Sequence, residues 1–310
     1  MKKVLVTGAT GFLGQHCLPL LVQKGYEIHG VARSRDRLKV RKQDNLQADL
    51  QAHLQWHQAD LLDPSQLKPL VAQIKPTHLL HLAWYAAPGW GSAPENFQWV
   101  RASLDLLQAF QASGGERLVV AGSCAEYDWD CGYCSEFRTP TRPQTLYGTC
   151  KQALQTLTQA YSKSVDLSAA WGRIFFTYGP YEHPQRLVAS VIRSLLRGEV
   201  AKCSHGQQLR DYLYARDVAD ALVTLLESSV TGPVNIASGE PIRLKEIVYK
   251  IGSQLDRADL IELGALPAQP QEAVLVMGDT HRLQHEVGWQ PQFGWQQGIE
   301  NSINWWKQNL

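Results

Sequence analysis

The chain has 310 residues, 44% hydrophobic and 19% charged, which allows one large or two ordinary domains with ample core. Its formal net charge is +1, with no basic or acidic block, so the charge gives no support for nucleic-acid binding. We see no signal-peptide pattern and no apolar run long enough to span a membrane, so we expect a cytoplasmic protein without a membrane partner.

The cysteines and histidines form no pattern typical of a metal site. Cys131 and Cys134 make a single CxxC without a second pair at zinc-ribbon spacing, and His183 and His205 are distant in sequence. We therefore expect no metal and ordinary thiols in a reducing compartment. A metal or redox role for the cysteine pair is the weaker alternative.

The N-terminal stretch combines a short apolar run, a glycine-rich turn and a helix-like segment. Residues 4–6 (Val-Leu-Val) predict a buried strand, and residues 7–14 continue as Thr-Gly-Ala-Thr-Gly-Phe-Leu-Gly. Glycines permit unusual backbone angles and close approach of a ligand or of the helix, and the free N–H groups at a helix start suit a pyrophosphate. The alternative is a glycine turn without a ligand. The predicted dinucleotide contacts here are Thr7, Gly8, Gly11, Phe12, Leu13 and Gly14.

The end of the second predicted strand, residues 26–33, bears on the choice of cofactor. Enzymes that prefer NAD usually place an acidic residue there to hold both ribose hydroxyls. This chain has Ala32, followed by Arg33, Ser34 and Arg35, and a guanidinium can bind a 2′-phosphate with two hydrogen bonds. We therefore expect Arg33 to favour NADP(H), with NAD(H) possible. The alternative is that these arginines are solvated turn charges.

Strands and helices then alternate along the chain, which predicts a parallel, doubly wound α/β sheet. Residues 36–55 are polar and predict a helix and a loop. The other expected elements are strands at 54–61, 78–84 and 118–123 and helices at 67–74 and 94–113. Ligands sit at the carboxyl ends of parallel strands, so we expect Leu82 and Ala83 beside the cofactor and Trp84 beside the substrate. We interpret His78 and His81 as hydrogen-bonded structural groups, with catalysis as the alternative.

Three residues form a chemically suited set, namely Ser123, Tyr147 and Lys151. Ser123 ends the fifth predicted strand. Tyr147 and Lys151 lie four residues apart in a predicted helix that runs to about Ser162, so they share one face. A phenol has a pKa of about 10, which a nearby ammonium and a nicotinamide cation would lower. The set predicts proton exchange between Tyr147 and a substrate oxygen, oriented by Ser123, while a hydride moves to or from nicotinamide.

With these residues the chain resembles, over nearly its whole length, the extended short-chain dehydrogenase/reductases of the nucleotide-sugar epimerase/dehydratase/reductase type. Residues 173–180 (Arg-Ile-Phe-Phe-Thr-Tyr-Gly-Pro) resemble that family's R-x-x-N-x-Y-G-P segment, and residues 210–219 resemble its R-D-[FY]-[IV]-x-V-x-D-V-A segment. The resemblance implies that Asp60 and Leu61 contact the adenine and that Arg210 holds the diphosphate of a nucleotide sugar.

The departures from the family pattern limit the reaction. Phe176 replaces a substrate-facing Asn, and Trp99 replaces an Asn near the start of the long helix. The sugar 4,6-dehydratases carry Asp-Glu after the strand-end Ser, where this chain has Cys124 and Ala125, which cannot exchange those protons. Glu126 comes next, but we expect its side chain to point to the opposite side. A 4,6-dehydratase is therefore disfavoured. The expected substrate contacts are Trp84, Cys124, Phe176 and Arg210.

The resemblance also implies the domain organisation and the assembly. We expect a Rossmann-type NAD(P)-binding domain over 1–177, regained at about 212–233. A smaller C-terminal α/β substrate-binding domain is expected over 178–211 and 234–310. The two long helices would pair across a two-fold axis in a homodimer.

The leading interpretation is an NADP-preferring reductase of a keto group, of the 4-keto-6-deoxy type, on a nucleotide-linked sugar. The first alternative is a nucleotide-sugar epimerase with a retained NAD(P). The second is a non-catalytic NAD(P)-binding regulator, which the intact set of Ser123, Tyr147 and Lys151 disfavours.

Overall fold

A computed structural model describes residues 2–34, 52–86, 89–267 and 272–310. Arg35 and most of the segment 36–55, for which a helix and a loop were expected, lie outside these residues. In the described ranges, no helix has both the length and the apolarity needed to cross a bilayer.

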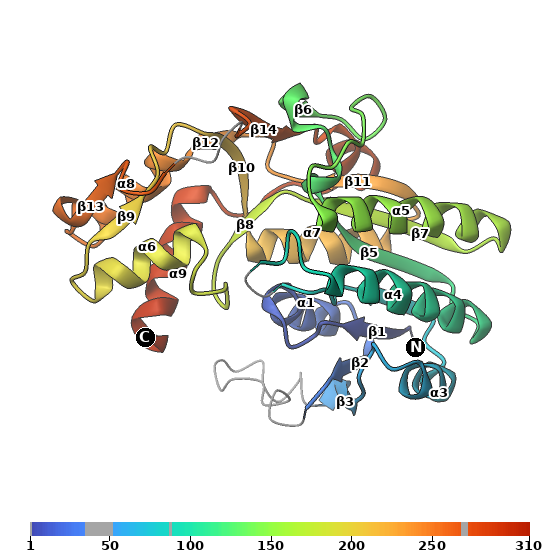
Figure 1. The fold of residues 1–310 in the computed structure, drawn as a ribbon. Helices are drawn as coiled ribbons and strands as arrows, with labels where there is room; N and C mark the ends of the chain where they lie inside the picture. Colours follow the sequence, from blue (N-terminus) through green and yellow to red (C-terminus); the bar gives the residue numbers. More distant parts are fainter. Residues whose placement is uncertain (1, 35–51, 87–88, 268–271) are drawn as a thin grey trace.

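A seven-stranded parallel sheet forms the centre of the molecule, in the order β11-β7-β5-β4-β1-β2-β3 (Figure 1). Its strands are β1 (Lys3–Thr7), β2 (Glu27–Ala32), β3 (Leu54–Gln58), β4 (His78–His81), β5 (Arg117–Ser123), β7 (Ser168–Ile174) and β11 (Gly232–Ile236). The inner strands are largely buried, and Val4, Leu5 and Val6 are fully buried, because helices cover both faces of a parallel sheet. The predicted Rossmann-type α/β fold is confirmed.

Helices pack on both faces of this sheet. One face carries α1 (Phe12–Gln23) and α7 (Ala215–Glu227); the other carries α3 (Pro64–Ile74), α4 (Glu95–Ala112) and α5 (Leu146–Ser164). Local signals set their ends. The Asp63 carboxylate accepts a 2.9 Å hydrogen bond from the Ser65 N–H at the start of α3, and Gly114, with a φ of 84°, follows the end of α4.

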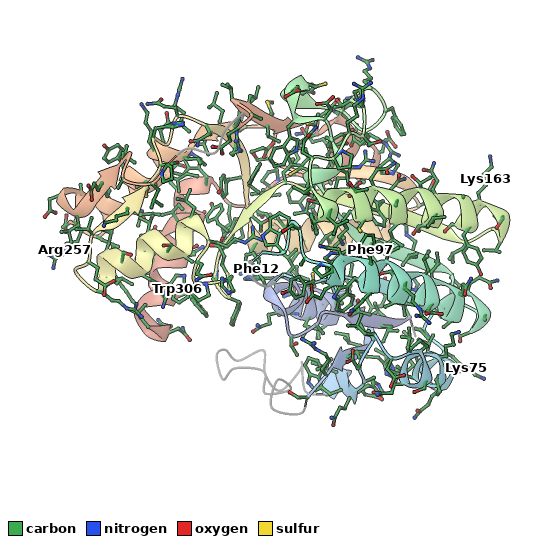
Figure 2. All side chains as sticks on the ribbon, in the orientation of Figure 1. Phe12, Lys75, Phe97, Lys163, Arg257 and Trp306 are labelled. Atoms are coloured by element: carbon green, nitrogen blue, oxygen red, sulfur yellow. The ribbon has the colours of Figure 1, made fainter. Side chains whose placement is uncertain are left out.

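A second, smaller α/β part lies beyond the carboxyl ends of the large sheet (Figure 1). Its sheet has the order β12-β10-β14-β6, and β8 pairs with β10. The strands are β6 (Tyr133–Cys134), β8 (Phe176–Tyr178), β10 (Leu209–Tyr214), β12 (Pro241–Arg243) and β14 (Leu275–Gly278). Helices α6 (Leu187–Leu196), α8 (Leu244–Gln254) and α9 (Trp295–Asn309) share one core, which includes the buried Trp306 (Figure 2). A two-stranded sheet of β9 (Ala201–Cys203) and β13 (Ile261–Leu263) and several short helices complete this part, η2 (Cys124–Glu126), η3 (Trp129–Cys131), η4 (Ala258–Leu260) and η5 (Arg282–Glu286).

The chain passes between the two sheets several times. α7 packs against α1 beside the large sheet, whereas β10, just before it, belongs to the second sheet. β11 belongs to the large sheet as far as Ile236, beyond the expected boundary at residue 233. Sheet membership therefore divides the chain at somewhat different points from those expected, and the domain boundaries stay a prediction.

Candidate active site

The glycine turn between β1 and α1 forms a cradle of bare backbone. Gly8 has a φ of 70°, and a Cβ added to it would lie 2.8 Å from the Ala83 nitrogen. A Cβ on Gly14 would lie 2.2 Å from the Gly8 carbonyl oxygen, so the close packing of α1 on the turn requires glycine. The Gly11 N–H donates to the Gly8 oxygen at 2.9 Å, and Gly11 caps α1, which begins with Phe12 and Leu13. The free N–H groups at this helix start fit a pyrophosphate.

The ends of β1 and β4 meet beside this cradle. The Ala83 N–H donates to Thr7 Oγ1 at 3.3 Å, and the Leu82 N–H donates to the Thr7 carbonyl oxygen at 3.2 Å. His81 Nδ1 and Nε2 lie 2.6 Å from Thr7 Oγ1 and 2.8 Å from Ser103 Oγ, and burial lowers the pKa of His81 to about 3. His81 is thus a neutral, hydrogen-bonded structural group, as interpreted from the sequence.

The expected adenosine contacts follow the neighbouring strands β2 and β3. Arg33 is exposed directly after β2, and its carbonyl oxygen accepts a 3.4 Å hydrogen bond from Gln58 Nε2. Asp60 follows β3, and its Oδ1 accepts a 3.0 Å hydrogen bond from the Leu62 N–H, while Leu61 is buried. Because β2 and β3 are the next strands beyond β1, these residues lie at the same edge of the sheet as the glycine cradle.

Ser123, Tyr147 and Lys151 come together where β5 ends and α5 begins. The Thr145 hydroxyl caps α5 by accepting a 3.1 Å hydrogen bond from the Gly148 N–H. One turn into α5, Lys151 Nζ donates to the Ala121 carbonyl oxygen at 2.7 Å and lies 6.0 Å from the centre of the Tyr147 ring. The Ser123 hydroxyl hydrogen-bonds to the Tyr147 phenol. A substrate oxygen beside the phenol would therefore face both hydroxyls.

Burial sets the charge states of this set. It raises the pKa of the Tyr147 phenol to about 12, and the hydrogen bond with Ser123 opposes only part of that rise. It lowers the pKa of Lys151 to about 7, although the Glu126 carboxylate favours the ammonium. The lowered phenol pKa expected from the sequence is therefore absent in the protein alone, because desolvation outweighs the neighbouring charge. Tyr147 is a neutral phenol at physiological pH and is ready to donate a proton.

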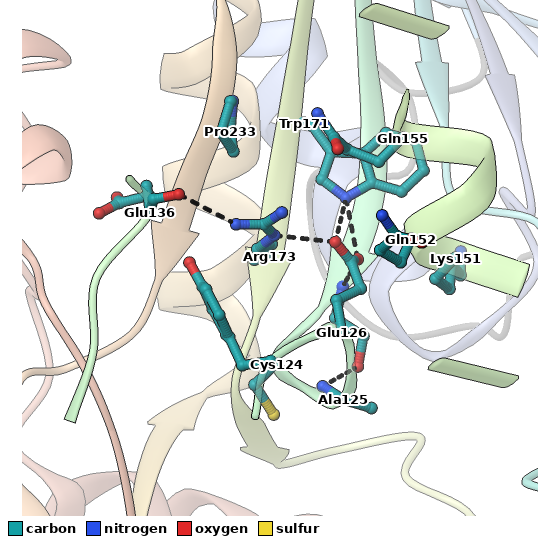
Figure 3. Close-up of polar contacts among 12 residues, drawn as sticks. Cys124, Ala125, Glu126, Glu136, Lys151, Gln152, Gln155, Trp171, Arg173 and Pro233 are labelled. Carbon is teal, nitrogen blue, oxygen red and sulfur yellow. Dashed lines mark hydrogen bonds and ion pairs between the residues drawn. The ribbon is translucent and has the colours of Figure 1, made fainter. Parts of the chain in front are cut away.

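Glu126 binds the backbone of Ser123 through its side chain. Figure 3 shows that side chain between Trp171 and Arg173. Its side chain is fully buried; Oε1 accepts from the Ser123 N–H at 2.7 Å, and Oε2 accepts from Arg173 Nε at 2.8 Å. The Trp171 indole N–H donates to both oxygens, at 2.9 and 3.1 Å. Glu126 thus turns toward β7 instead of the substrate side, as expected. Ser123 and Glu126 have the Ser-x-x-Glu spacing of a capping box, a signal from which this contact could have been predicted.

Three of the expected substrate residues lie together beyond Ser123. Phe176 packs with the buried Cys124 in one apolar cluster, and the guanidinium of Arg210 lies 5.6 Å from the Phe176 ring. Arg210 is itself buried and ion-paired with Glu272 at 3.0 Å. The structure therefore groups these residues, but the guanidinium expected to hold a diphosphate has a carboxylate partner.

Trp84, the fourth expected substrate residue, lies against Tyr147 near the start of α5. Residues that were not singled out from the sequence lie beside it. The Trp84 ring meets the Tyr147 ring edge-on at 6.3 Å, and the Trp90 ring does so at 4.7 Å. The fully buried Asn96 accepts a 2.8 Å hydrogen bond from Trp84 Nε1 and donates to the Trp90 carbonyl oxygen at 2.8 Å. Two features of the sequence could have pointed to these contacts: Asn96 is a polar residue in the first turn of α4, and Trp90 lies in the aromatic loop before that helix.

The described part of the chain holds no cluster of three or more His, Cys, Asp or Glu side chains that could bind a metal ion. A model of the NAD dependent epimerase/dehydratase family matches residues 4–237. The chain belongs to this family. The match includes the glycine cradle, Ser123, Tyr147 and Lys151.

Similar members of the family act on nucleotide sugars. The mouse dTDP-D-glucose 4,6-dehydratase is 23% identical over 100% of this chain and 90% of its own length. The structure of MoeE5 in complex with UDP-glucuronic acid and NAD is 28% identical, with a TM-score of 0.81 over 99% of this chain and 100% of its own. The UDP-N-acetylglucosamine 4-epimerase of Methanobrevibacter ruminantium M1, at 22% identity over 100% and 99% of the two chains, has a TM-score of 0.87 and shows the shared fold.

Proposed function

We propose that this member of the family reduces a keto group, of the 4-keto-6-deoxy type, on a nucleotide-linked sugar. The observation that carries the proposal is the pairing of a neutral Tyr147 phenol with the Ser123 hydroxyl, beside Lys151 and at the same edge of the sheet as the glycine cradle. Reduction of a carbonyl needs a proton donor at the oxygen, and a phenol with a raised pKa is in the required acid form.

Each residue of the set has a role in this reaction. The Ser123 hydroxyl orients the carbonyl, and the Tyr147 phenol gives its proton to the oxygen as alkoxide character develops. Lys151 stabilises the phenolate that remains and holds the nicotinamide ribose. When bound, a reduced nicotinamide supplies the hydride.

The cofactor is NADP(H) by preference, with NAD(H) possible. Gly8, Gly11 and Gly14 would hold its pyrophosphate, and Asp60 and Leu61 would contact its adenine. The exposed Arg33 after Ala32 supports a 2′-phosphate contact. The NAD bound to MoeE5 supports the NAD(H) alternative.

The substrate would contact Trp84, Cys124, Phe176 and Arg210. Dehydration is disfavoured because Cys124 is buried, with its thiol pKa raised by burial, and because both oxygens of Glu126 are engaged by Ser123, Trp171 and Arg173.

An epimerase with a retained cofactor is the second candidate. It is favoured by the fold shared with the M. ruminantium 4-epimerase and by the nucleotide sugar and NAD bound together in MoeE5. The intact set of Ser123, Tyr147 and Lys151 disfavours a regulator without catalysis.

A panel of nucleotide-linked 4-keto sugars incubated with NADPH tests these candidates. For a reductase, NADPH absorbance falls and Tyr147→Phe slows the reaction by about 10²–10⁴-fold, because the proton donor is lost. Tyr161→Phe, on the same helix with its hydroxyl 3.5 Å from Gln111, is the matched control and should stay at the wild-type rate. Interconversion of sugar epimers without net NADPH loss would identify an epimerase instead. A biological activity that survives Tyr147→Phe, without turnover of any sugar, would leave the regulator.

We also propose a cytoplasmic homodimer. α4 and α5 pack side by side (Figure 1). Each exposes a large apolar side chain, Phe97 at 62%, which Figure 2 labels, and Leu157 at 47%. Apolar side chains on neighbouring helices suit an interface with a second copy. All six cysteines are free thiols, which favours a reducing compartment.

A further inference from the structure

The ammonium of Lys151 rests on the face of the Trp84 indole. Nζ lies 3.8 Å from the ring centre, and the lysine is only 3% exposed. The described hydrogen bond of Nζ is the one to the Ala121 carbonyl oxygen. A desolvated cation over an indole face is held by the ring quadrupole, and Trp is the strongest of the aromatic side chains in this role.

Few charges near Lys151 support its protonated form. From η2, the Glu126 carboxylate acts on it, but that carboxylate is already paired with Arg173 at 2.8 Å. From β4, His81 is neutral, and from α5 itself, Tyr147 is a neutral phenol. Beside the Ala121 carbonyl oxygen at 2.7 Å, the indole face at 3.8 Å is the described group that offsets the loss of water around the ammonium.

Other residues hold this indole in place. Its Nε1–H donates to Asn96 Oδ1 at 2.8 Å, and the Asn96 amide is fixed in turn by the carbonyl oxygens of Trp90 and Ala93, both at 2.8 Å. The Trp99 ring packs against Trp84, with ring centres 6.3 Å apart. The ring cannot turn away from Lys151 without breaking the bond to a fully buried amide.

We propose that Trp84 is a positioning residue, fixed by Asn96, that keeps Lys151 protonated and beside Tyr147 through a cation–π contact. The inference rests on the proposed function for the role of Lys151 in catalysis, but the charge of Lys151 can be measured without a substrate. Trp84, proposed above as a substrate contact, would in addition act through the lysine. Its indole extends the pH range over which the active site carries the ammonium.

The test is the pKa of Lys151 in a series at position 84, measured by NMR of lysine side chains labelled at Cε. The Lys151 signal is identified by its absence in Lys151→Met. We expect a small drop in Trp84→Phe, which keeps a weaker ring face, and a drop of about one unit in Trp84→Leu, which has none. The alkaline limb of the rate profile with NADPH should move to lower pH by the same amount. Trp99→Phe, which alters a neighbour of Trp84 that does not lie over Lys151, should leave the pKa unchanged.

An unchanged Lys151 pKa in folded Trp84→Leu would overturn the inference. If that variant does not fold, Trp84→Met replaces it, since a flexible thioether fills irregular space without offering a ring face. A wild-type pKa in that variant counts equally against the inference. The Lys151 pKa could fall in Trp84→Leu although the wild-type protein turns over no nucleotide sugar. That result would support the Trp84 contact and refute the proposed function, so the experiment tests the two hypotheses separately.

Discussion

Single residues around Tyr147 owe their charge states mainly to loss of water. Burial is the largest influence on the pKa of Tyr147, Lys151 and His81, and it favours the neutral form of each. Neighbouring charges change these values less, because the nearest carboxylate, Glu126, is engaged by Arg173. The site is therefore built from neutral hydrogen-bonding groups and one ammonium held near its point of deprotonation.

His81 should make the fold sensitive to acid. Its pKa is about 3 in the folded protein and about 6.5 in the unfolded chain. Below pH 6.5 only the unfolded chain takes up the proton, so the free energy of unfolding decreases as the pH is lowered. Replacing His81 by Gln removes this contribution. Between pH 7 and pH 5, the free energy of unfolding should fall by about 2 kcal/mol less in His81→Gln than in the wild type. Urea unfolding at the two pH values measures the difference.

The exposed His183 is the control for this experiment. His183→Gln should show the same acid sensitivity as the wild type. Equal acid sensitivity in His81→Gln and the wild type would contradict the assignment of His81 as a buried neutral group.

Arg173 should contribute strongly to the stability of the fold, because it pairs with the buried Glu126 that binds the Ser123 backbone. It is 2% exposed and pairs at 2.8 Å with Glu126, which is fully buried. Arg173→Leu would leave the Glu126 carboxylate buried without its cation, which costs roughly 3–5 kcal/mol. Denaturant unfolding should show this loss. Adding Glu126→Leu should recover part of it, because no unpaired charge then remains.

The exposed pair of Arg243 and Glu246, 3.8 Å apart, provides the comparison. Arg243→Leu should change stability by no more than about 1 kcal/mol, because water screens an exposed pair. A similar loss in both arginine variants would show that burial of the Glu126 pair is not decisive.

The sequence predicted some site residues and missed others for a physical reason. Tyr147 and Lys151 are four residues apart on one helix, and Ser123 ends a strand, so spacing alone brings them into one predicted site. Asn96 and Trp90 act through contacts made by an irregular loop, and no periodicity describes such a loop. The raised pKa of Tyr147 in the protein alone was not predicted, because burial cannot be read from spacing.

At the scale of elements, the length of a strand decides whether it could be predicted from the sequence. The strands β1 to β5, of four to seven residues each, appear where expected, whereas no strand was predicted at β7 or β11. β6, β8 and β12 have two or three residues each and exist only through partners far along the chain. Local sequence holds too little information to specify strands of that length.

The contact between α1 and the glycine turn should not tolerate a methyl group. In Gly14→Ala the new Cβ would lie 2.2 Å from the Gly8 oxygen, so α1 must move away from the turn. We expect a loss of about 1–3 kcal/mol in stability and much weaker nicotinamide cofactor binding. Chemical denaturation and cofactor fluorescence titration measure the two effects.

Gly91→Ala is the matched control, since its added methyl would meet Thr145 at 3.9 Å, an ordinary contact. It should retain stability and cofactor affinity. Normal cofactor affinity in Gly14→Ala would argue against a phosphate cradle at this turn.

At the scale of the whole molecule, the proposed homodimer places α4 and α5 at the interface between the two copies. The double variant Phe97→Glu with Leu157→Glu would place charges on the two exposed apolar positions. Burying those charges at an interface is costly, so the variant should be monomeric while the wild type is dimeric. Light scattering coupled to size-exclusion chromatography gives the mass of each.

Tyr249→Glu, which changes a 47% exposed aromatic residue on α8 in the smaller part, serves as the control and should remain dimeric. A wild-type monomer, or a dimer that persists in the double variant, would rule out this interface.

The expected division into a cofactor part and a substrate part comes from the resemblance and stays a prediction, whereas the order of the second sheet was not predicted at all. Its neighbouring strands β10, β14 and β6 come from distant stretches of the chain, and only the folded molecule reveals their pairing.

The pairing of β6 with β14 ties the candidate active site to a segment that the ribosome makes much later than β6. Tyr133 and Cys134 lie between Ser123 and Tyr147 in sequence, and their strand partners are Met277 and Gly278. A growing chain can form the glycine turn and α5 while β6, in the segment between Ser123 and Tyr147, still lacks its partner strand. Pairings across such long separations form late. A nascent chain would thus form the glycine turn and α5 well before the segment between Ser123 and Tyr147 gains its partner strand.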